Sequence, residues 1–446
     1  MAQTITTKIV NLTAVVTAAP VPSQLQQSGA LVSVGGSTLA TNAYQFCGTL
    51  AAVEAILQTS GTGNYVELLN MATTFFAQGN GVGLYVLELG YSANIDTQIT
   101  SLQTWITANP KLFYAYLTPV DWDTLSQEVG SVTVGTATYT YTATPTVTFT
   151  AATGGGVTAT GTVVLSGTQV ASITITNPGY YPSQPAPTAT LSAASTGTAP
   201  ALTVNMANAQ NLLAANYESP TGKTYFFVST TTTGVASYPV NKAIIATVPA
   251  PTAPSTEFTA AMPFYQWLVN NPSQANPLAP MAFRYAYGVT PWPASGQNSE
   301  ITTVLSAYGN LIGTGAEGGI SNSILFKGTT MDGEQAAWWY GIDWFQIQVN
   351  QALAAAVING SNSVPPLTYN QAGINYLQKI AQAVANSAVK FGCALTATVT
   401  ATPFGTYTTD NPANYNAGIY GGFQAQVVGQ NGFLVLDFAL DAIQIA

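Results

Sequence analysis

The sequence of 446 residues contains no histidine. Without imidazole, Ser–His and Cys–His nucleophilic pairs, histidine-based proton transfer and histidine metal ligands are excluded. The two cysteines, Cys47 and Cys393, lie far apart and fit neither metal nor redox spacing, so we interpret them as buried thiols. We therefore expect a protein that is not an enzyme and that carries no cofactor and no metal.

Charge is also scarce. Asp, Glu, Lys and Arg make up 6% of the residues, against about 25% in a typical soluble protein. No apolar run reaches the ~18 residues of a membrane span, so we expect no membrane insertion. The eight Lys and Arg are scattered, whereas nucleic-acid binding needs clustered cations, so we expect no direct contact with nucleic acid. Because interface cores are depleted in charge, the composition favours an assembly subunit whose surface is covered by copies of itself or by partners.

The last stretch, Gly421–Ala446, predicts β-structure with an open edge. Two apolar runs flank Asn431-Gly432, which favours a tight hairpin because both residues tolerate positive φ. The second run alternates and contains no Lys or Pro that would block pairing with another chain. An ordinary strand inside the chain's own sheet is the alternative. For strand addition between copies we assign Phe433, Leu434, Val435, Leu436, Asp437, Phe438, Ala439 and Leu440.

Residues 1–22 form a predicted N-terminal arm. A strand-like run is followed by a second one, Leu12–Val16, and Pro20 and Pro22 end the arm. Terminal strands of this kind either join their own sheet or extend the sheet of a neighbour. A secretory signal is the poorer interpretation, because polar residues interrupt the apolar run. For strand exchange between copies we assign Thr4, Ile5, Thr6, Thr7, Lys8, Ile9 and Val10.

Residues 23–128 and 210–322 show the alternation of strands and helices that is typical of an α/β sheet with right-handed crossovers. The first two helices have predicted buried faces, namely Val66, Leu69, Ala72 and Phe76, then Ile95, Ile99, Leu102 and Ile106. Further predicted helices are Leu212–Tyr217, Phe258–Val269 and Glu300–Leu311. The predicted strands are Gln24–Val34 (strand or loop), Leu84–Leu89, Leu112–Leu117, Thr224–Val228, Ala243–Val248 and Phe283–Tyr287.

Residues 129–209 predict an inserted all-β module. No Asp, Glu, Lys or Arg occurs between Glu128 and Glu218. Short alternating runs separated by Gly and Pro favour a small β-sandwich over a flexible Thr-rich linker. The module would split one βαβ unit, between Leu112–Leu117 and Thr224–Val228. Its predicted strands are Val132–Val134, Thr138–Thr142, Val147–Thr150, Val163–Leu165, Ile173–Thr176, Thr188–Leu191 and Leu202–Met206.

Residues 323–446 predict a C-terminal domain built on two long helices. A strand, Ile324–Lys327, precedes the first helix, Asn359-Gly360 caps that helix, and a last strand, Leu395–Thr400, follows the second. Two long helices with apolar stripes and a short Pro-containing loop between them should pack together. The predicted stripes are Trp338, Ile342, Phe345, Val349, Leu353 and Ala356, then Ile374, Leu377, Ala381, Val384 and Ala388.

Three short patterns could indicate chemistry, and each has a structural explanation. Gly313–Gly318 matches the dinucleotide-binding pattern G-x-G-x-x-G, but it follows a predicted helix instead of a strand, so we interpret it as a loop. Asp121 with Asp123, and Asp332 with Glu334, could serve a glycosidase, which needs two carboxylates across a cleft. Both pairs precede predicted helical segments, where acidic side chains cap free N–H groups, so we predict capping for both.

The ordered series of elements resembles the contractile-tail sheath proteins of bacterial viruses. The resemblance rests on Ile324–Gly333 (ILFKGTTMDG), the long helix with Asp343, and the loop Val364–Thr368, and it covers Gly79–Leu117 and Leu212–Ile445 but not the Thr-rich insertion. It implies a fold class of α/β (α+β) with a C-terminal β segment for inter-subunit strand addition, to which the inserted all-β domain is added. It also implies stacked hexameric rings that form a helical sleeve around a tail tube.

From this resemblance we expect a structural subunit of the virion tail, assembled in the host cytoplasm, which contracts to drive the tube through the host envelope. Its partners would be further copies of itself, the tail tube protein, the baseplate and the tail terminator. Alternatives are the sheath of a phage-derived bacterial injection system, a non-contractile virion or surface fibre with an adhesive β domain, and a secreted hydrolase that uses a carboxylate pair.

Overall fold

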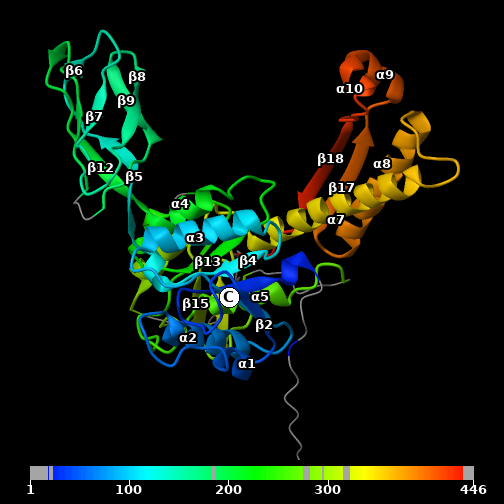
Figure 1. Ribbon diagram of the computed structural model, residues 1–446, viewed down its shortest axis with the longest axis horizontal. Helices are drawn as coiled ribbons and strands as arrows, with labels where there is room; N and C mark the ends of the chain where they lie inside the picture. Colours follow the sequence, from blue (N-terminus) through cyan, green and yellow to red (C-terminus); the bar gives the residue numbers. More distant parts are fainter. Residues whose placement is uncertain are drawn as a thin grey trace, which may run out of the picture.

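The computed structural model describes residues 19, 24–182, 186–238, 240–274, 282–293, 296–314 and 322–434. The predicted exchange strand Thr4–Val10 lies outside these ranges, and of Phe433–Leu440 only Phe433 and Leu434 lie inside them. A central body carries two projections, a β-rich module and an arm of helices and strands, which rise from the same side of the body (Figure 1).

The body is organised around a six-stranded sheet in the order β14-β13-β4-β1-β3-β2. Five strands are parallel, and β2 pairs with β3 in the antiparallel sense. The parallel strands are almost wholly buried, as expected where helices cover both faces of a sheet. This architecture confirms the predicted α/β class. The strands are β1 (Gly29–Ser33), β2 (Tyr44–Cys47), β3 (Leu84–Glu88), β4 (Ala115–Leu117), β13 (Tyr225–Ser229) and β14 (Ile244–Thr247).

Helices cover both faces of the sheet. On one face α1 (Leu50–Glu54), α2 (Tyr65–Ala77) and α5 (Ala261–Val269) enclose a core that includes Phe75, Phe227 and Trp267. On the other face α3 (Ile95–Ala108), α4 (Ala209–Ala215) and α6 (Asn298–Ser306) enclose a second core. Short 3-10 turns lie at η1 (Leu25–Gln27), η2 (Val120–Trp122) and η3 (Gly234–Ser237).

The predicted buried face of α3 is confirmed, but that of α2 is correct only for Ala72, with Leu69 and Phe76 half-buried. Val66 is 55% exposed. The buried row of α2 is Leu68, Met71, Ala72 and Phe75, with i, i+3, i+4, i+7 spacing, so it shares only Ala72 with the predicted row. Because α2 has apolar residues on two adjacent rows, periodicity alone could not decide which row faces the sheet.

Two further elements differ from the prediction. Phe283–Tyr287 is not a strand: it forms a single bridge, Tyr285 to Ile324, and Phe283 is not extended, with a φ of 63°. The helix predicted for Glu300–Leu311 ends at Ser306, and Leu311 begins β15 (Leu311–Thr314), which pairs with β16 (Ser323–Phe326).

The position of β15 also corrects the interpretation of the glycine pattern. Gly313 and Thr314 close this strand instead of forming a loop after a helix. In the antiparallel β15–β16 pair, a Cβ on Gly313 would lie 2.6 Å from the ring of Phe326. The glycine thus makes room for a packed ring, and residues 315–318 of the pattern lie outside the described residues.

The module between β4 and α4 is built from antiparallel strand pairs with their own core, which includes Tyr139, Tyr141, Phe149 and Tyr181. Strands occur at all seven predicted positions, but β5 begins earlier, at Leu125, so that β5 and β12 connect the module to the body (Figure 1). The strands are β5 (Leu125–Val134), β6 (Tyr139–Thr140), β7 (Val147–Phe149), β8 (Thr160–Ser166), β9 (Gln169–Asn177), β10 (Ala189–Leu191), β11 (Thr196–Gly197) and β12 (Leu202–Asn208). Because β4 and β13 are adjacent and parallel, the module lies within one crossover, as predicted.

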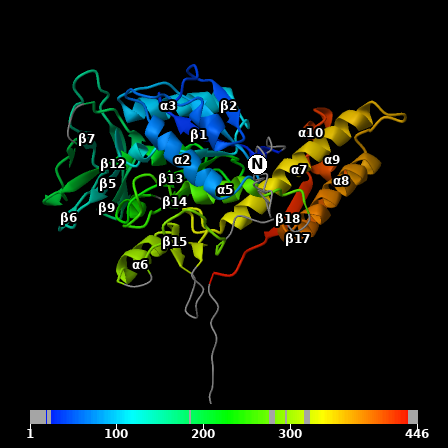
Figure 2. The same ribbon diagram turned by 90° about the horizontal axis from the view of Figure 1, so that it is seen from below.

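The arm begins with α7 (Ala336–Ser361), one helix that starts in the body and continues into the arm (Figure 2). It packs against α8 (Gln371–Lys390), which confirms the predicted helix pair. In the body half of α7 most residues are buried, but Trp338 and Ile342 of the predicted stripe are only half-buried, so the stripe describes the outer half alone. Asn359-Gly360 lies inside the helix instead of capping it. The arm continues with β17 (Ala394–Ala401), two short helices that were not predicted, α9 (Phe404–Asp410) and α10 (Pro412–Asn416), and β18 (Phe423–Gly429).

Candidate assembly site

The outer part of the arm is a two-stranded antiparallel sheet, β17–β18, with one covered face and one open face. Ala397 and Val399 of β17 are buried in the arm core, which includes Ala381 and Ala385 of α8. Alternate side chains point the other way and are exposed. The open face consists of uncharged side chains, namely Thr396, Thr398, Thr400, Gln424, Gln426 and Val428.

The free edge of β17 is closed by side chains of α8. Gln382 Nε2 donates to the carbonyl of Ala397 at 3.3 Å, and its Oε1 accepts from the Val399 N–H at 2.8 Å. Gln378 Nε2 donates to the carbonyl of Val399 at 3.1 Å. These side chains bind backbone groups that a neighbouring strand would otherwise bind. The carbonyls of Ala397 and Val399 and the Val399 N–H are therefore not free to pair with another chain.

The free edge of β18 has no such cover among the described residues. The Thr402 N–H donates to the Gly422 carbonyl, and β17 and β18 pair in constant register from Thr396 to Ala401. Alternation along this register directs the N–H and C=O groups of Phe423, Ala425 and Val427 away from β17. β18 contains no charged residue and no proline. An edge of this kind readily accepts a further strand.

Beyond β18 the chain passes the start of α7. The Gly432 N–H donates to Gln335 Oε1 at 2.8 Å, and Gln335 Nε2 donates to the Gly432 carbonyl at 3.0 Å. The partner strand of β18 is β17, and the second arm of the hairpin predicted at Asn431-Gly432 lies outside the described residues. Phe433, one of the predicted exchange residues, is 78% exposed.

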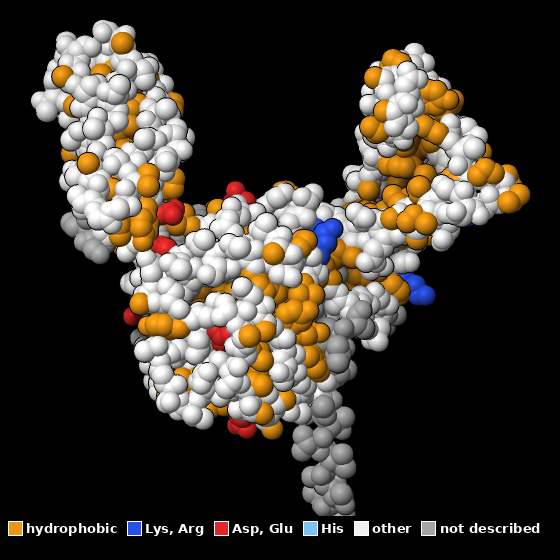
Figure 3. Space-filling model, viewed as in Figure 1, with side chains coloured by type: hydrophobic (Ala, Val, Ile, Leu, Met, Phe, Trp, Pro, Cys, Tyr) orange, Lys and Arg blue, Asp and Glu red, His pale blue; other side chains and the backbone are white. Residues whose placement is uncertain are grey.

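The surface of the arm is unusually apolar. Figure 3 shows hydrophobic side chains gathered along the arm and at its tip, with no charged side chain on the upper part of this face. From residue 344 to residue 434 the only charged residues are Lys379, Lys390 and Asp410. Large exposed hydrophobic residues of the arm include Val357, Ile358, Val364, Leu395, Ile419 and Val428.

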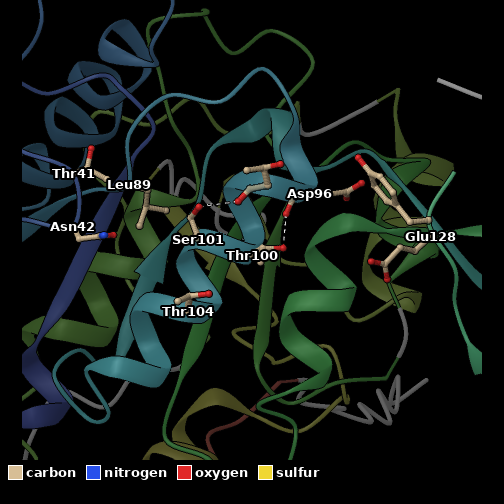
Figure 4. Close-up of a pocket in the computed structure, with 10 residues that line it drawn as sticks. Thr41, Asn42, Leu89, Asp96, Thr100, Ser101, Thr104 and Glu128 are labelled. Carbon is tan, nitrogen blue, oxygen red and sulfur yellow. Dashed lines mark hydrogen bonds between the residues drawn. The ribbon is translucent and has the colours of Figure 1, made fainter. Parts of the chain in front are cut away.

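A polar groove of about 440 Å³ lies between α3 and the base of the module (Figure 4). The hydroxyls of Thr100 and Ser101 donate to carbonyls of α3 itself, so they present only lone pairs to the groove. Burial raises the pKa of Glu128, and the carboxyl of Asp96 adds to this effect. The Gln127 N–H donates to Asp96 Oδ2 at 3.0 Å, which joins β5 to α3. The groove is therefore part of the joint between module and body.

The carboxylate pairs do not cap helices as predicted. Asp332 accepts from the Trp339 indole N–H at 2.7 Å and from the Glu334 N–H at 3.0 Å, while the N-cap of α7 is Gln335. Asp123 accepts from Tyr238 Oη at 2.8 Å and from Asn208 Nδ2 at 3.2 Å. The capping interpretation is wrong, because the Asp332 carboxylate is bound by the Trp339 side chain seven residues further along, and Asp123 is bound by side chains distant in sequence.

Cys47 and Cys393 are free and buried, as predicted. Burial raises the pKa of Cys47 to about 11 and that of Cys393 to about 12. Neither thiol is therefore a reactive thiolate near neutral pH. Within the described ranges no three His, Cys, Asp or Glu side chains form a group that could hold a metal ion, and no helix is long and apolar enough to cross a membrane.

Comparisons with protein-family models and with curated proteins gave no match. Among solved structures, a chain of the anti-feeding prophage helical sheath in its contracted state superimposes with a TM-score of 0.50 and 10% identity, over 99% of this chain and 100% of that one. The chain has the fold of that sheath protein. A chain of the anti-feeding prophage baseplate in its contracted state gives a TM-score of 0.48, with 11% identity over 98% and 99% of the two chains. The sheath tail protein Lin1278 of Listeria innocua gives 0.38, with 10% identity over 90% and 94%.

The assigned exchange residues rest on two strand-like runs, the second of which lacks Lys and Pro, and on the family resemblance. The receiving edge, β18, was not assigned, although Phe423–Gly429 has an uncharged sequence without proline. Gln378 and Gln382 were also missed, because one turn of spacing between two glutamines does not reveal that they face a strand edge.

Proposed function

We propose that this chain is the structural subunit of a contractile tail sheath, which polymerises around a tail tube and shortens to drive the tube through a cell envelope. The observation that carries the proposal is the likeness in fold to a helical sheath protein, which extends over the whole of both chains. The low charge of the chain and the apolar surface of the arm support it, because both suit a surface covered by neighbouring copies.

Strand addition at β18 is the proposed link between copies. Phe423, Ala425 and Val427 direct their backbone groups outward, and the sequence holds two alternating terminal runs that could pair with them. In this proposal Thr4–Val10 and Phe433–Leu440 of adjacent copies extend the β17–β18 sheet. Head-to-tail links of this type generate a helical polymer where the rotation between copies does not close on itself.

The remaining partners follow from the same proposal. A sleeve of stacked hexameric rings, formed in the host cytoplasm, would enclose a tail tube protein and end at a baseplate and a tail terminator within the virion. The sheath of a bacterial injection system would use the same subunit geometry. Contraction would be a change between two packings of rigid subunits that remain linked through their strands.

Electron microscopy of the purified full-length chain tests the proposal. We expect sleeves or stacked rings, and we expect a chain that lacks residues 2–18 to form none, since it lacks the run Thr4–Val10. A full-length chain that stays monomeric at high concentration would contradict the sheath function.

We further propose that the β module decorates the outside of the assembly. It carries no charged residue between Glu128 and Glu218, it has its own core, and it projects from the body on two strands (Figure 1). The same features suit a second candidate function, an adhesive domain on a non-contractile fibre.

Deletion of Ser131–Ala207 distinguishes these functions. The cut is compatible with the fold because Gly130 lies against Ala207, with a Cβ position 2.8 Å from the Ala207 Cα. For a sheath we expect the deleted chain to assemble with the same helical repeat as the full chain. Loss of assembly together with loss of cell-surface binding would favour the adhesive fibre.

A further inference from the structure

The point where α7 leaves the body holds a buried cluster of charged and phenolic side chains. Asp343 is 0% exposed. Its Oδ2 accepts from Tyr114 Oη at 2.8 Å and from Tyr225 Oη at 2.7 Å, and its Oδ1 lies 2.9 Å from Lys223 Nζ. These donors come from just before β4 and from the start of β13, so one carboxylate joins α7 to two central strands of the sheet.

Aromatic rings enclose this carboxylate. Tyr114 and Tyr225 lie 5.1 Å apart between ring centroids, and Trp267 lies within 5.8 Å of both, as well as 5.4 Å from Tyr340 of α7. Burial raises the pKa of both tyrosines well above the ordinary value, and the charge of Asp343 adds to this. The phenols therefore remain donors to Asp343 at all ordinary pH values.

A second cation reinforces the joint. Lys242 is 3% exposed, its Nζ donates to the Gly222 carbonyl at 2.9 Å, and it lies 4.3 Å from the ring centroid of Trp339 on α7. Burial lowers the pKa of Lys242, and the carboxylate of Asp343 opposes that shift.

Asp343 stands at the boundary between two cores. Trp339 and Tyr340, before it, belong to a core of the body, whereas Trp344 and Phe345, after it, belong to the arm core. Apolar contacts also hold α7 here, from Trp339 and Tyr340 in the body core to Trp344 and Phe345 in the arm core, but such contacts are non-directional. Rotation or sliding of α7 would instead leave the Asp343 charge buried without partners, which costs far more than a changed apolar contact.

We propose that Asp343 is the positioning residue of the arm, whose buried partners fix the direction in which α7 leaves the body. An ion pair of this kind adds little to stability compared with well-packed apolar side chains, so its value lies in selecting one arrangement. Its consequence for assembly rests on the proposed sheath function, because neighbours can add strands in register only if every arm projects at the same angle.

The test measures the angle of the arm in the full-length chain. Spin labels on Thr104→Cys in α3 and Ser363→Cys at the end of α7 report the distance between body and arm, since both sites are exposed while Cys47 and Cys393 are buried. Labelled chain is diluted into excess unlabelled chain, so the distance is obtained whether or not the chain polymerises. A failure of the sheath function appears separately, as missing sleeves in electron micrographs.

The decisive variant replaces the cluster with apolar side chains of similar volume: Lys223→Met, Asp343→Leu, Tyr114→Phe and Tyr225→Phe. We expect it to fold and its distance distribution to be at least twofold broader than that of the wild type. Tyr238→Phe is the matched control, because it removes a buried phenol that donates to Asp123 within the body, and we expect its distribution to be unchanged.

A distribution as narrow as that of the wild type in the folded fourfold variant overturns the proposal. If the fourfold variant does not fold, Tyr114→Phe with Tyr225→Phe decides the question, since it removes two donors to Asp343 but keeps the ion pair. A broader distribution in this double variant supports the proposal, and an unchanged one overturns it.

Discussion

Glu88 is a buried carboxylate that accepts hydrogen bonds from the turns around it. It lies at the carboxyl end of β3, the edge at which α/β sheets often bind ligands. It accepts from the N–H groups of Gly35 at 2.7 Å, Ser37 at 3.0 Å and Gly90 at 2.6 Å, and from the hydroxyls of Ser33 and Ser37. The Glu88 carboxylate therefore occupies the space at this sheet edge and links the turn after β1 to the turn after β3.

Glu67 differs, because burial raises its pKa from 4.5 to about 7, against the opposing hydrogen bonds from Val120 and Asn64. Between pH 4.5 and 7 the unfolded chain loses this proton while the folded chain keeps it, so stability falls as pH rises through this window. A shift of this size corresponds to roughly 3 kcal/mol at most.

Glu67→Gln removes this titration and keeps the acceptor for the Val120 N–H. We expect the variant to be more stable than the wild type at pH 8 and to differ little from it at pH 4.5, as measured by urea unfolding. Glu54→Gln, at an exposed position of α1, is the control and should follow the wild-type pH profile. A wild-type pH slope in Glu67→Gln would show that Glu67 titrates normally.

At the scale of elements, the two edges of the β17–β18 sheet have opposite properties. Gln378 and Gln382 close one edge, whereas the other is open among the described residues. Ala425 lies on the open edge with its N–H directed outward. Proline at such a position removes a donor without breaking the pairing to β17.

We therefore expect Ala425→Pro to reduce assembly at least tenfold, as measured by sedimentation, while the melting temperature of the unassembled chain changes little. Ala425→Thr keeps the N–H and serves as the matched control, for which we expect normal assembly. Normal sleeves from Ala425→Pro would show that neighbouring copies do not use this edge.

At the scale of the whole molecule, charge is too sparse to hold an assembly together. The arm has three charged residues from 344 to 434, and the module has none between Glu128 and Glu218. At 0.1 M, salt screens interactions between exposed charges that lie more than about 10 Å apart, but it does not weaken strand pairing or apolar burial. Copies of this chain can therefore contact one another mainly through strand pairing and apolar burial.

We expect assembled material to persist when NaCl is raised from about 50 mM to about 500 mM, because the Debye length shortens while apolar contacts remain. The net charge of −9 makes copies repel each other weakly, so added salt should if anything favour assembly. Sedimentation across this salt series measures the effect. Dissociation at high salt would indicate that ion pairs between copies dominate.

The sequence alone determined the class of the body, the strands of the module and the helix pair of the arm. These elements have strong local signals, such as the alternation in Ile173–Thr176 and the spacing of Ile99, Leu102 and Ile106, because backbone geometry forces those periods. Only the tertiary structure decided which row of α2 is buried, which edge of the arm sheet is open and which donors surround Asp343. Each of these depends on residues far apart in the chain, such as Tyr114 with Asp343, and a local pattern carries no information about such distant partners.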